Sequence, residues 1–160
     1  MGNKIIILKY FIFHIFFINI FNPCFSQDIS NIESSIKSQI SNDNVVFSPT
    51  PRGFIIRFDD KTFFDKNSIE LKENSYNIIE SIAKIVKDTD KILIIEVNTD
   101  EEFDNKQSWE ISILRANELT RYIICCKLLK EYEIKSIGFG NTMPIKNRIN
   151  RIDFVLADKD

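Results

Sequence analysis

Two residues of opposite charge, Asp100 and Arg115, lie at the two ends of an acid-rich segment and together have the groups to hold a small ligand. Asp100 follows a short β-branched run, and Arg115 lies in a helical pattern in which Ser112 is suited to be the N-cap, so we expect Arg115 in the first helical turn. A carboxylate facing a planar guanidinium can hold the ammonium and the carboxylate of one zwitterion. The helix N-terminus would add backbone N–H donors and a positive dipole end. The spacing therefore indicates a zwitterion clamp.

A simpler interpretation uses the same two residues. Asp100 and Arg115 would pair with each other at the surface, for about 0–1 kcal/mol of stability and with no function. Composition alone favours this interpretation, so the choice depends on features elsewhere in the chain.

The other chemistry-bearing residues give little support to catalysis, metal binding or nucleic-acid binding. The single histidine, His14, lies in a segment that we expect to be removed, which leaves no Ser-His-Asp or Cys-His pair and no histidine ligand for a metal. The acids in 100–104 alternate like the start of a calcium loop, but Asn105 and Ile111 stand where that loop needs Gly and Glu. A net charge of −2 argues against a nucleic-acid binder that relies on bulk positive charge. We predict no enzyme activity, no metal and no cofactor.

Residues 1–26 have the composition of a secretory signal peptide, with two lysines, no acid, a short apolar middle and a small-residue exit. Cleavage after Ser26 would leave a chain that begins at Gln27 in the periplasm. An uncleaved membrane anchor is the main alternative, although Lys9 interrupts the apolar run. Lipidation at Cys24 is a third, although the preceding Asn-Pro departs from the small residues that lipoprotein signals need.

The two remaining cysteines, Cys125 and Cys126, are adjacent within a helical pattern. Neighbouring helical side chains point about 100° apart, which is poor geometry for a disulfide. We therefore predict that both fill the core as small side chains.

Residues 27–44 are expected to form a short helix or a linker, and 45–160 a single domain. Because strand–helix–strand connections are right-handed, both long helices should cover one face of a mixed sheet. The predicted fold is a two-layer α/β sandwich (α+β) in the order β-β-α-β-α-β-β. Its expected elements are strands at 45–48 and 53–58, a helix at 72–87, a strand at 91–98, a helix at 112–130, and strands at 134–139 and 151–156.

Five blocks in this order resemble the OmpA-like domains, a family that includes the C-terminal domain of motility protein B. The resemblance covers 45–156, nearly the whole mature chain, and SWEISILRA has the form typical of the motility branch. The blocks are PRGFIIRFDDKTFFDKNSIEL, IIEVNTD, SWEISILRA, GFGNTMPI and NRIDFVL.

This resemblance implies a non-catalytic domain that grips peptidoglycan in the cell envelope. In members that bind through diaminopimelate, the positions that hold this stem-peptide residue match Asp100 and Arg115, which favours the clamp over the surface ion pair. An envelope protein partner is also expected. The candidate peptidoglycan site comprises Asp100, Arg115, Thr99, Ser108, Asn67 and Arg151.

Several positions depart from the family pattern. Val97-Asn98 stands where the family has Gly-His, Ser108 replaces an Asn, and one arginine of the terminal strand is missing, with Arg151 retained. These departures motivate a second hypothesis: a degenerate member that keeps the fold and serves as a protein-interaction or assembly component of an envelope complex without wall binding.

Overall fold

The computed structural model describes residues 45–99, 104–145 and 150–159, together with residues 30, 33, 34, 37 and 38, which are helical. Residues 36–160 form one compact unit, which is described by itself. The predicted signal peptide lies outside the described residues, and so does Asp100. Within the described part of the chain, no helix has both the length and the apolar composition needed to span a bilayer.

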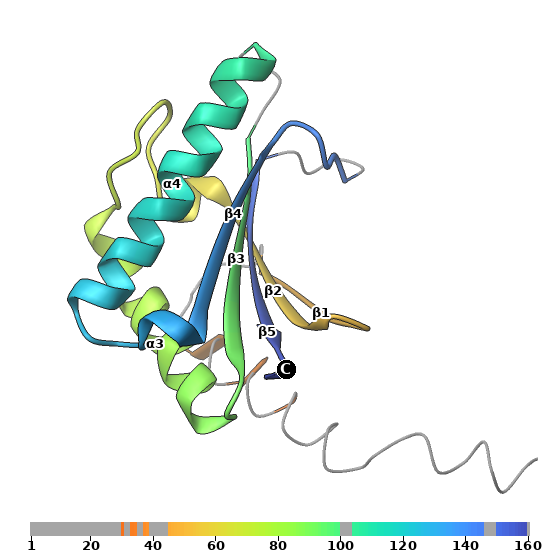
Figure 1. Cartoon of the computed structure of the whole chain (residues 1–160), viewed down its shortest axis with the longest axis vertical. Coiled ribbons are helices and arrows are strands. Elements are labelled where there is room, and N and C mark those ends of the chain that lie inside the picture. The colour runs from red at the N-terminus through yellow and green to blue at the C-terminus, as the bar shows by residue number, and fades with distance from the viewer. Residues whose placement is uncertain are drawn as a thin grey trace, which may run out of the picture. The chain divides into compact units, whose positions relative to one another are not determined.

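The sheet has five strands in the order β1-β2-β5-β3-β4 (Figure 1). β3 and β4 are parallel, and the other neighbours are antiparallel, which confirms the predicted mixed sheet. The predicted hairpin is also present, with its turn at Pro51 and Arg52, and Pro49 lies in the edge strand, where a missing N–H is tolerated. The strands are β1 (Val46–Thr50), β2 (Gly53–Asp59), β3 (Ile92–Asn98), β4 (Ile134–Gly140) and β5 (Arg151–Ala157).

Two long helices, α3 (Tyr76–Asp88) and α4 (Asn105–Cys125), lie on the same side of the sheet (Figure 1). The predicted two-layer sandwich and its element order are therefore confirmed. The helices contact each other through the stacked rings of Tyr76 and Tyr122, whose centroids are 4.6 Å apart. Short 3-10 helices, η1 (Asp60–Thr62), η2 (Glu73–Ser75) and η3 (Glu131–Glu133), lie between the main elements.

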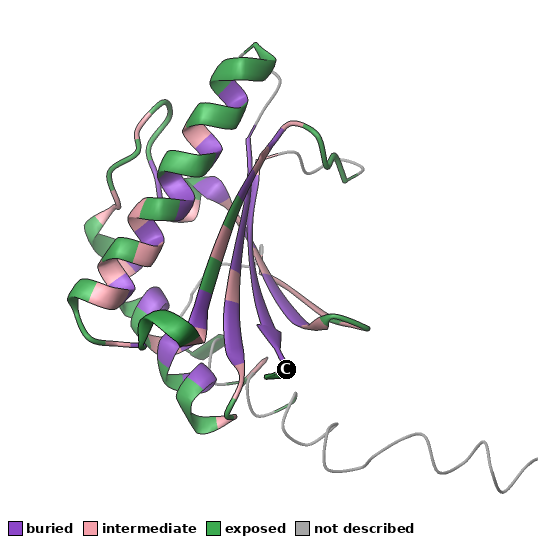
Figure 2. Ribbon diagram, viewed as in Figure 1, coloured by how far each residue is buried: buried purple, intermediate pink, exposed green. Residues whose placement is uncertain are grey.

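The core lies between the helices and the sheet, where the inward sides of both layers are buried (Figure 2). Phe58, Phe63 and Phe154 form an aromatic cluster with ring centroids 5.2 to 5.8 Å apart. Each such fully buried side chain contributes about 1.5–3 kcal/mol relative to exposure. The helical stripe predicted for α3 is buried at all five positions, Ile78, Ile79, Ile82, Ile85 and Val86.

The predicted start of α4 at Ser112 is wrong. The carboxylate of Asp104 accepts a hydrogen bond from the backbone N–H of Gln107 at 2.8 Å, so Asp104 is the N-cap and the helix begins at Asn105. Ser112 is instead buried within the helix and accepts a hydrogen bond from the N–H of Gly140. Arg115 consequently lies about three turns inside the helix, beyond the reach of its N-terminal dipole.

The predicted end of α4 is also too late, because Lys127 adopts a left-handed conformation with φ of 55°. The N–H of Leu128 bonds to the carbonyl of Ile123, and that of Lys127 to Ile124, as in a Schellman motif. Cys125 and Cys126 occupy this exposed terminus. The prediction that they fill the core is therefore wrong.

Candidate functional site

The Arg115 side chain is held inside the protein by three hydrogen bonds. Nε donates to the carbonyl of Ser68 at 2.9 Å, Nη1 to Asp60 Oδ2 at 2.8 Å, and Nη2 to the carbonyl of Asp65 at 3.2 Å. The guanidinium carbon also lies 5.0 Å from the centroid of the Phe64 ring, within cation–π range. Only 4% of the Arg115 side chain is exposed. These contacts fix its position and orientation.

The loop that receives Arg115 is a tight turn over Asp65–Ser68. The N–H of Ser68 bonds to the carbonyl of Asp65 at 3.0 Å, and Asn67 has a φ of 62°. A positive φ at the third position of such a turn favours Gly or Asn, which explains the residue found there. Asn67 is exposed, between the two residues whose carbonyls bond to Arg115. The structure therefore brings two predicted site residues, Asn67 and Arg115, into the same cluster.

Asp60 is the acidic partner of Arg115 and was not predicted from the sequence. Its Oδ2 accepts from Arg115, whereas its Oδ1 is buried without a hydrogen-bond partner. The pKa of Asp60 is raised to about 6, mainly by burial and also by the neighbouring Asp59, while Arg115 opposes the rise. The pair is therefore poorly compensated, since desolvation outweighs the attraction.

The guanidinium of Arg115 retains hydrogen-bonding capacity. It carries five N–H donors, three of which are used as described above. Among the described residues, no acceptor takes the other two. A small anionic group that reached this guanidinium would thus find donors already fixed in place.

Thr99 and Ser108 are brought together at the end of β3 and the start of α4. Thr99 Oγ1 donates to the carbonyl of Ser108 at 2.7 Å, and the Thr99 N–H bonds to the carbonyl of Gly140 at 3.0 Å. Both residues are almost completely buried. They hold fixed the two ends of the segment that contains Asp100, whose placement relative to Arg115 stays a prediction.

Arg151 belongs to a different cluster. It is the first residue of β5, and its Nε donates to Asp153 Oδ2 at 3.3 Å. The alternation of β5 turns both residues away from the face on which Phe154 joins the core beneath the helices. Burial lowers the pKa of Arg151, and Asp153 opposes this shift. The structure thus places Arg151 with Asp153, on the face of the sheet opposite the helices.

Asp60 and Asn98 were not among the site residues predicted from the sequence. Within the described residues, the buried side-chain atoms without a hydrogen-bond partner are Asp60 Oδ1 and both amide atoms of Asn98. Asn98 directly precedes Thr99, so these unsatisfied groups flank the candidate site. The consecutive acids at the end of β2 were a signal in the sequence, because two adjacent carboxylates there need separate partners.

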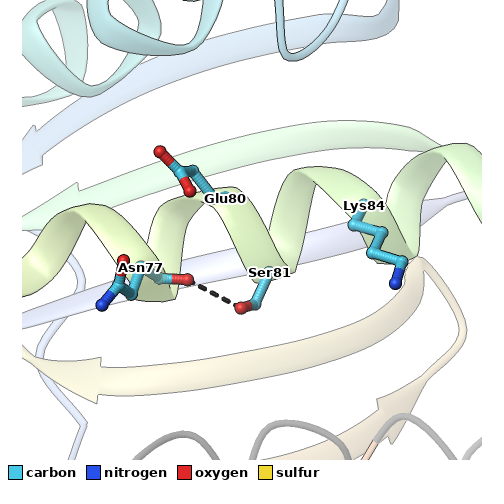
Figure 3. Close-up of a pocket in the computed structure, with 4 residues that line it drawn as sticks. All are labelled: Asn77, Glu80, Ser81 and Lys84. Atoms are coloured by element: carbon cyan, nitrogen blue, oxygen red, sulfur yellow. Dashed lines mark hydrogen bonds between the residues drawn. The ribbon is translucent and has the colours of Figure 1, made fainter.

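A separate depression of about 480 Å³ lies on α3, bordered by Asn77, Glu80, Ser81 and Lys84 (Figure 3). Ser81 Oγ donates to the carbonyl of Asn77, one turn earlier on the same helix. The described lining comes from one helix, and its side chains do not converge on a common point (Figure 3). The described residues also contain no cluster of three His, Cys, Asp or Glu side chains able to hold a metal. The Arg115 cluster is therefore the better candidate site.

Comparison with known proteins gives a family match. The family model of the OmpA family matches residues 63–152, which include Arg115, Asn67 and the segment around Asp100. A sequence search of curated proteins finds no match.

Three solved structures illustrate the likeness in fold. A MotB-like protein from Desulfovibrio vulgaris is 15% identical with a TM-score of 0.69, over 84% of this chain and 91% of that chain. The periplasmic domain of Helicobacter pylori MotB is 18% identical with a TM-score of 0.64, over 73% of this chain and 83% of that chain. The cell wall anchor of the T6SS from Pseudomonas aeruginosa is 14% identical with a TM-score of 0.62, over 81% and 97%. At these identities the likeness establishes the fold alone.

Proposed function

Because the chain belongs to the OmpA family, we propose that it is a non-catalytic module that binds peptidoglycan in the cell envelope. One similar structure is described as a cell wall anchor and another as a periplasmic domain of MotB, which is consistent with such a role. The observation that carries the proposal is the fixed guanidinium of Arg115, which retains two N–H donors beside an exposed turn.

The proposed ligand is the zwitterionic end of a diamino acid in the stem peptide, such as diaminopimelate. Arg115 binds the carboxylate, and Asp100 binds the ammonium on the same carbon. Asn67 lies at the rim, where its amide can both donate and accept. Thr99 and Ser108 set the position of the segment that carries Asp100, while Arg151 supports β5.

The module acts in the periplasm in this proposal, after export by residues 1–26. It anchors a complex to the wall through a second envelope protein. The described surface offers large exposed apolar side chains on α4 and after β4, among them Trp109, Ile113 and Met143. These are candidates for that contact.

A second function is favoured by a specific observation. Arg115 is almost completely buried and bonded to three groups of its own chain, which is also what a purely structural arginine would show. In that case the domain is an assembly component of an envelope complex and does not bind the wall. Wall binding itself separates the two functions.

The test is co-sedimentation of the purified protein with peptidoglycan. We expect retention by the parent, a loss of about 10- to 100-fold in affinity for Asp100→Ala and Arg115→Lys, and no loss for Arg121→Ala, which removes an exposed arginine of the same helix. Arg115→Lys keeps the charge but lacks the planar fork.

A competition experiment needs no substitution. Free diaminopimelate should release the protein from the wall, whereas pimelate, which has the same chain and carboxylates but no ammonium groups, should not. Absence of the parent protein from the wall pellet would contradict wall binding and favour the assembly role.

A further inference from the structure

We propose that Asp60 is a positioning residue for Arg115 and that its carboxylate competes with the ligand carboxylate for the same guanidinium, so that wall binding is accompanied by uptake of one proton at Asp60. This inference rests on the proposed function and adds a regulation of the same site. The proton comes from solvent and converts the carboxylate to the neutral acid.

The geometry makes Asp60 a competitor for Arg115. Its Oδ2 lies 2.8 Å from Nη1, in a pair whose side chains are 4% and 10% exposed. The second oxygen, Oδ1, has no partner, so the protein compensates the buried charge with a single hydrogen bond. A ligand carboxylate on the same guanidinium would place two anions on one cation. Protonation of Asp60 removes that repulsion and leaves an acid hydroxyl.

The charged groups near Asp60 come from three elements. Arg115 reaches it from α4, and Asp59 at the end of β2 adds a like charge. Lys61 follows in η1, and its backbone N–H bonds to Asp59 Oδ1. Within the described residues, Arg115 is the one cation bonded to Asp60. In the adjoining loop, Lys72 lies 3.3 Å from Asp65 and donates to the carbonyl of Lys61.

The pKa of Asp60 in the free protein lies within the pH range over which binding is to be measured. Its pKa is about 6, raised mainly by burial and held down from a higher value by Arg115. A ligand carboxylate weakens that lowering effect, so the pKa of Asp60 must rise further in the complex. By linkage, the ligand then binds more tightly as the pH falls through about 6.

The experiment measures affinity for peptidoglycan between about pH 5.5 and about pH 7.5. If ligand binding raises the pKa of Asp60 by one unit or more, the affinity of the parent should increase about five- to twentyfold toward the acidic end. Asp60→Asn keeps an acceptor for Arg115 but cannot ionise, so its affinity should not change with pH in this way. The variant also corrects for titration of the wall itself, which is the same for both proteins.

Asp59→Asn provides a second variant if Asp60→Asn does not fold. Asn is as good an N-cap as Asp, so η1 should be kept. Since the charge of Asp59 raises the pKa of Asp60, its removal should move the affinity gain to lower pH. Calorimetry with a soluble stem peptide, in two buffers of different ionisation enthalpy, should show proton uptake in the parent near pH 6 and none in Asp60→Asn.

The outcomes separate the two proposals. Binding by the parent that does not change with pH, or a pH dependence that persists in Asp60→Asn, overturns the role of Asp60 and leaves wall binding intact. If the affinity gain of Asp59→Asn has the same pH midpoint as that of the parent, the role of Asp60 is also contradicted. Absence of binding across the whole pH range overturns both proposals together.

Discussion

Two buried carboxylates on opposite sides of the sheet are satisfied to different degrees. Asp153 accepts two hydrogen bonds from Arg57, at 2.6 and 2.7 Å, and a third from Arg151 at 3.3 Å. Asp60 accepts one, from Arg115 at 2.8 Å, and its other oxygen has no partner. Both are less than 8% exposed, so burial does not distinguish them.

The difference shows which acid has its hydrogen bonds supplied by the fold. Asp153 lies between two arginines, and the bidentate geometry raises the pKa of Arg57. Arg52 extends this face through Glu96, at 2.6 Å. Asp60 keeps a raised pKa, because a single bond does not offset its desolvation. A buried ionisable group that lacks hydrogen-bond partners and lies next to an exposed loop indicates a functional site. A buried ionisable group with all its hydrogen bonds made indicates a structural role.

The largest expected effect on stability comes from removing Asp153, the acid shared by Arg57 and Arg151. Asp153→Ala leaves the buried Arg151 and the partly buried Arg57 without their shared acid. We expect the free energy of unfolding to fall by about 3–5 kcal/mol, as is usual when one partner of a buried pair is removed. Urea unfolding measures this change.

Wall binding by the folded fraction of Asp153→Ala should stay at the parental value, because this cluster lies on the face away from α4. If the free energy of unfolding falls by less than about 1 kcal/mol, the bonds between Asp153 and the two arginines do not stabilise the fold as a buried ion pair does.

Arg115→Met should have a smaller effect on stability and a larger one on binding. It removes three hydrogen bonds and leaves the carbonyls of Asp65 and Ser68 unpaired, while Asp60 can become neutral. We expect a loss of about 2–3 kcal/mol in unfolding free energy and no detectable retention on peptidoglycan. Unfolding and co-sedimentation are measured on the same preparation. Full retention on the wall by this variant would make Arg115 a structural residue only.

The sequence predicted the elements of this fold better than their contacts. Apolar periodicity located the buried stripe of α3, and the Pro-rich turn located the hairpin, because both signals are local. The start of α4 was misplaced because Ser112 and Asp104 are both acceptable N-caps, and only the packing of Ser112 against Gly140 decides between them.

The candidate site was predictable only in part, for a related reason. Arg115 was identified because the SWEISILRA block resembles the family pattern. Its acidic partner Asp60 is 55 positions away in the chain. A separation of that size leaves no periodic signal, and the contact exists only because η1 and α4 meet in the folded protein. Arg151 was predicted as a member of the candidate peptidoglycan site, and that role stays a prediction. Its bond to Asp153 could not be predicted, because it follows from strand alternation combined with packing.

Asp60→Asn should have a modest and pH-dependent effect on stability. The pKa of Asp60 is about 6 in the folded protein and about 3.9 when unfolded, so the folded state binds the proton more tightly. The resulting stability is present below the unfolded pKa and is lost as the pH rises through about 6. We therefore expect the parent to lose about 1 kcal/mol relative to Asp60→Asn between about pH 5 and about pH 7.5.

Urea unfolding of both proteins across this range measures that difference. A constant difference would mean that Asp60 is not protonated near pH 6 in the free protein. The source of any pH-dependent wall binding would then have to be sought elsewhere.

The smallest expected effect comes from the exposed ion pair of Arg121 and Glu118, which has two hydrogen bonds as the pair of Arg57 and Asp153 does. Arg121 donates two hydrogen bonds to Glu118 on the surface of α4, at 2.8 and 2.5 Å, and its side chain is 65% exposed. Water solvates both groups when the pair opens, so Arg121→Ala should change neither the urea midpoint nor the retention on peptidoglycan measurably. A clear loss of stability would mean that hydrogen-bond geometry, rather than burial, sets the value of these pairs. The large loss of stability expected for Asp153→Ala would then follow from its hydrogen bonds and not from its burial.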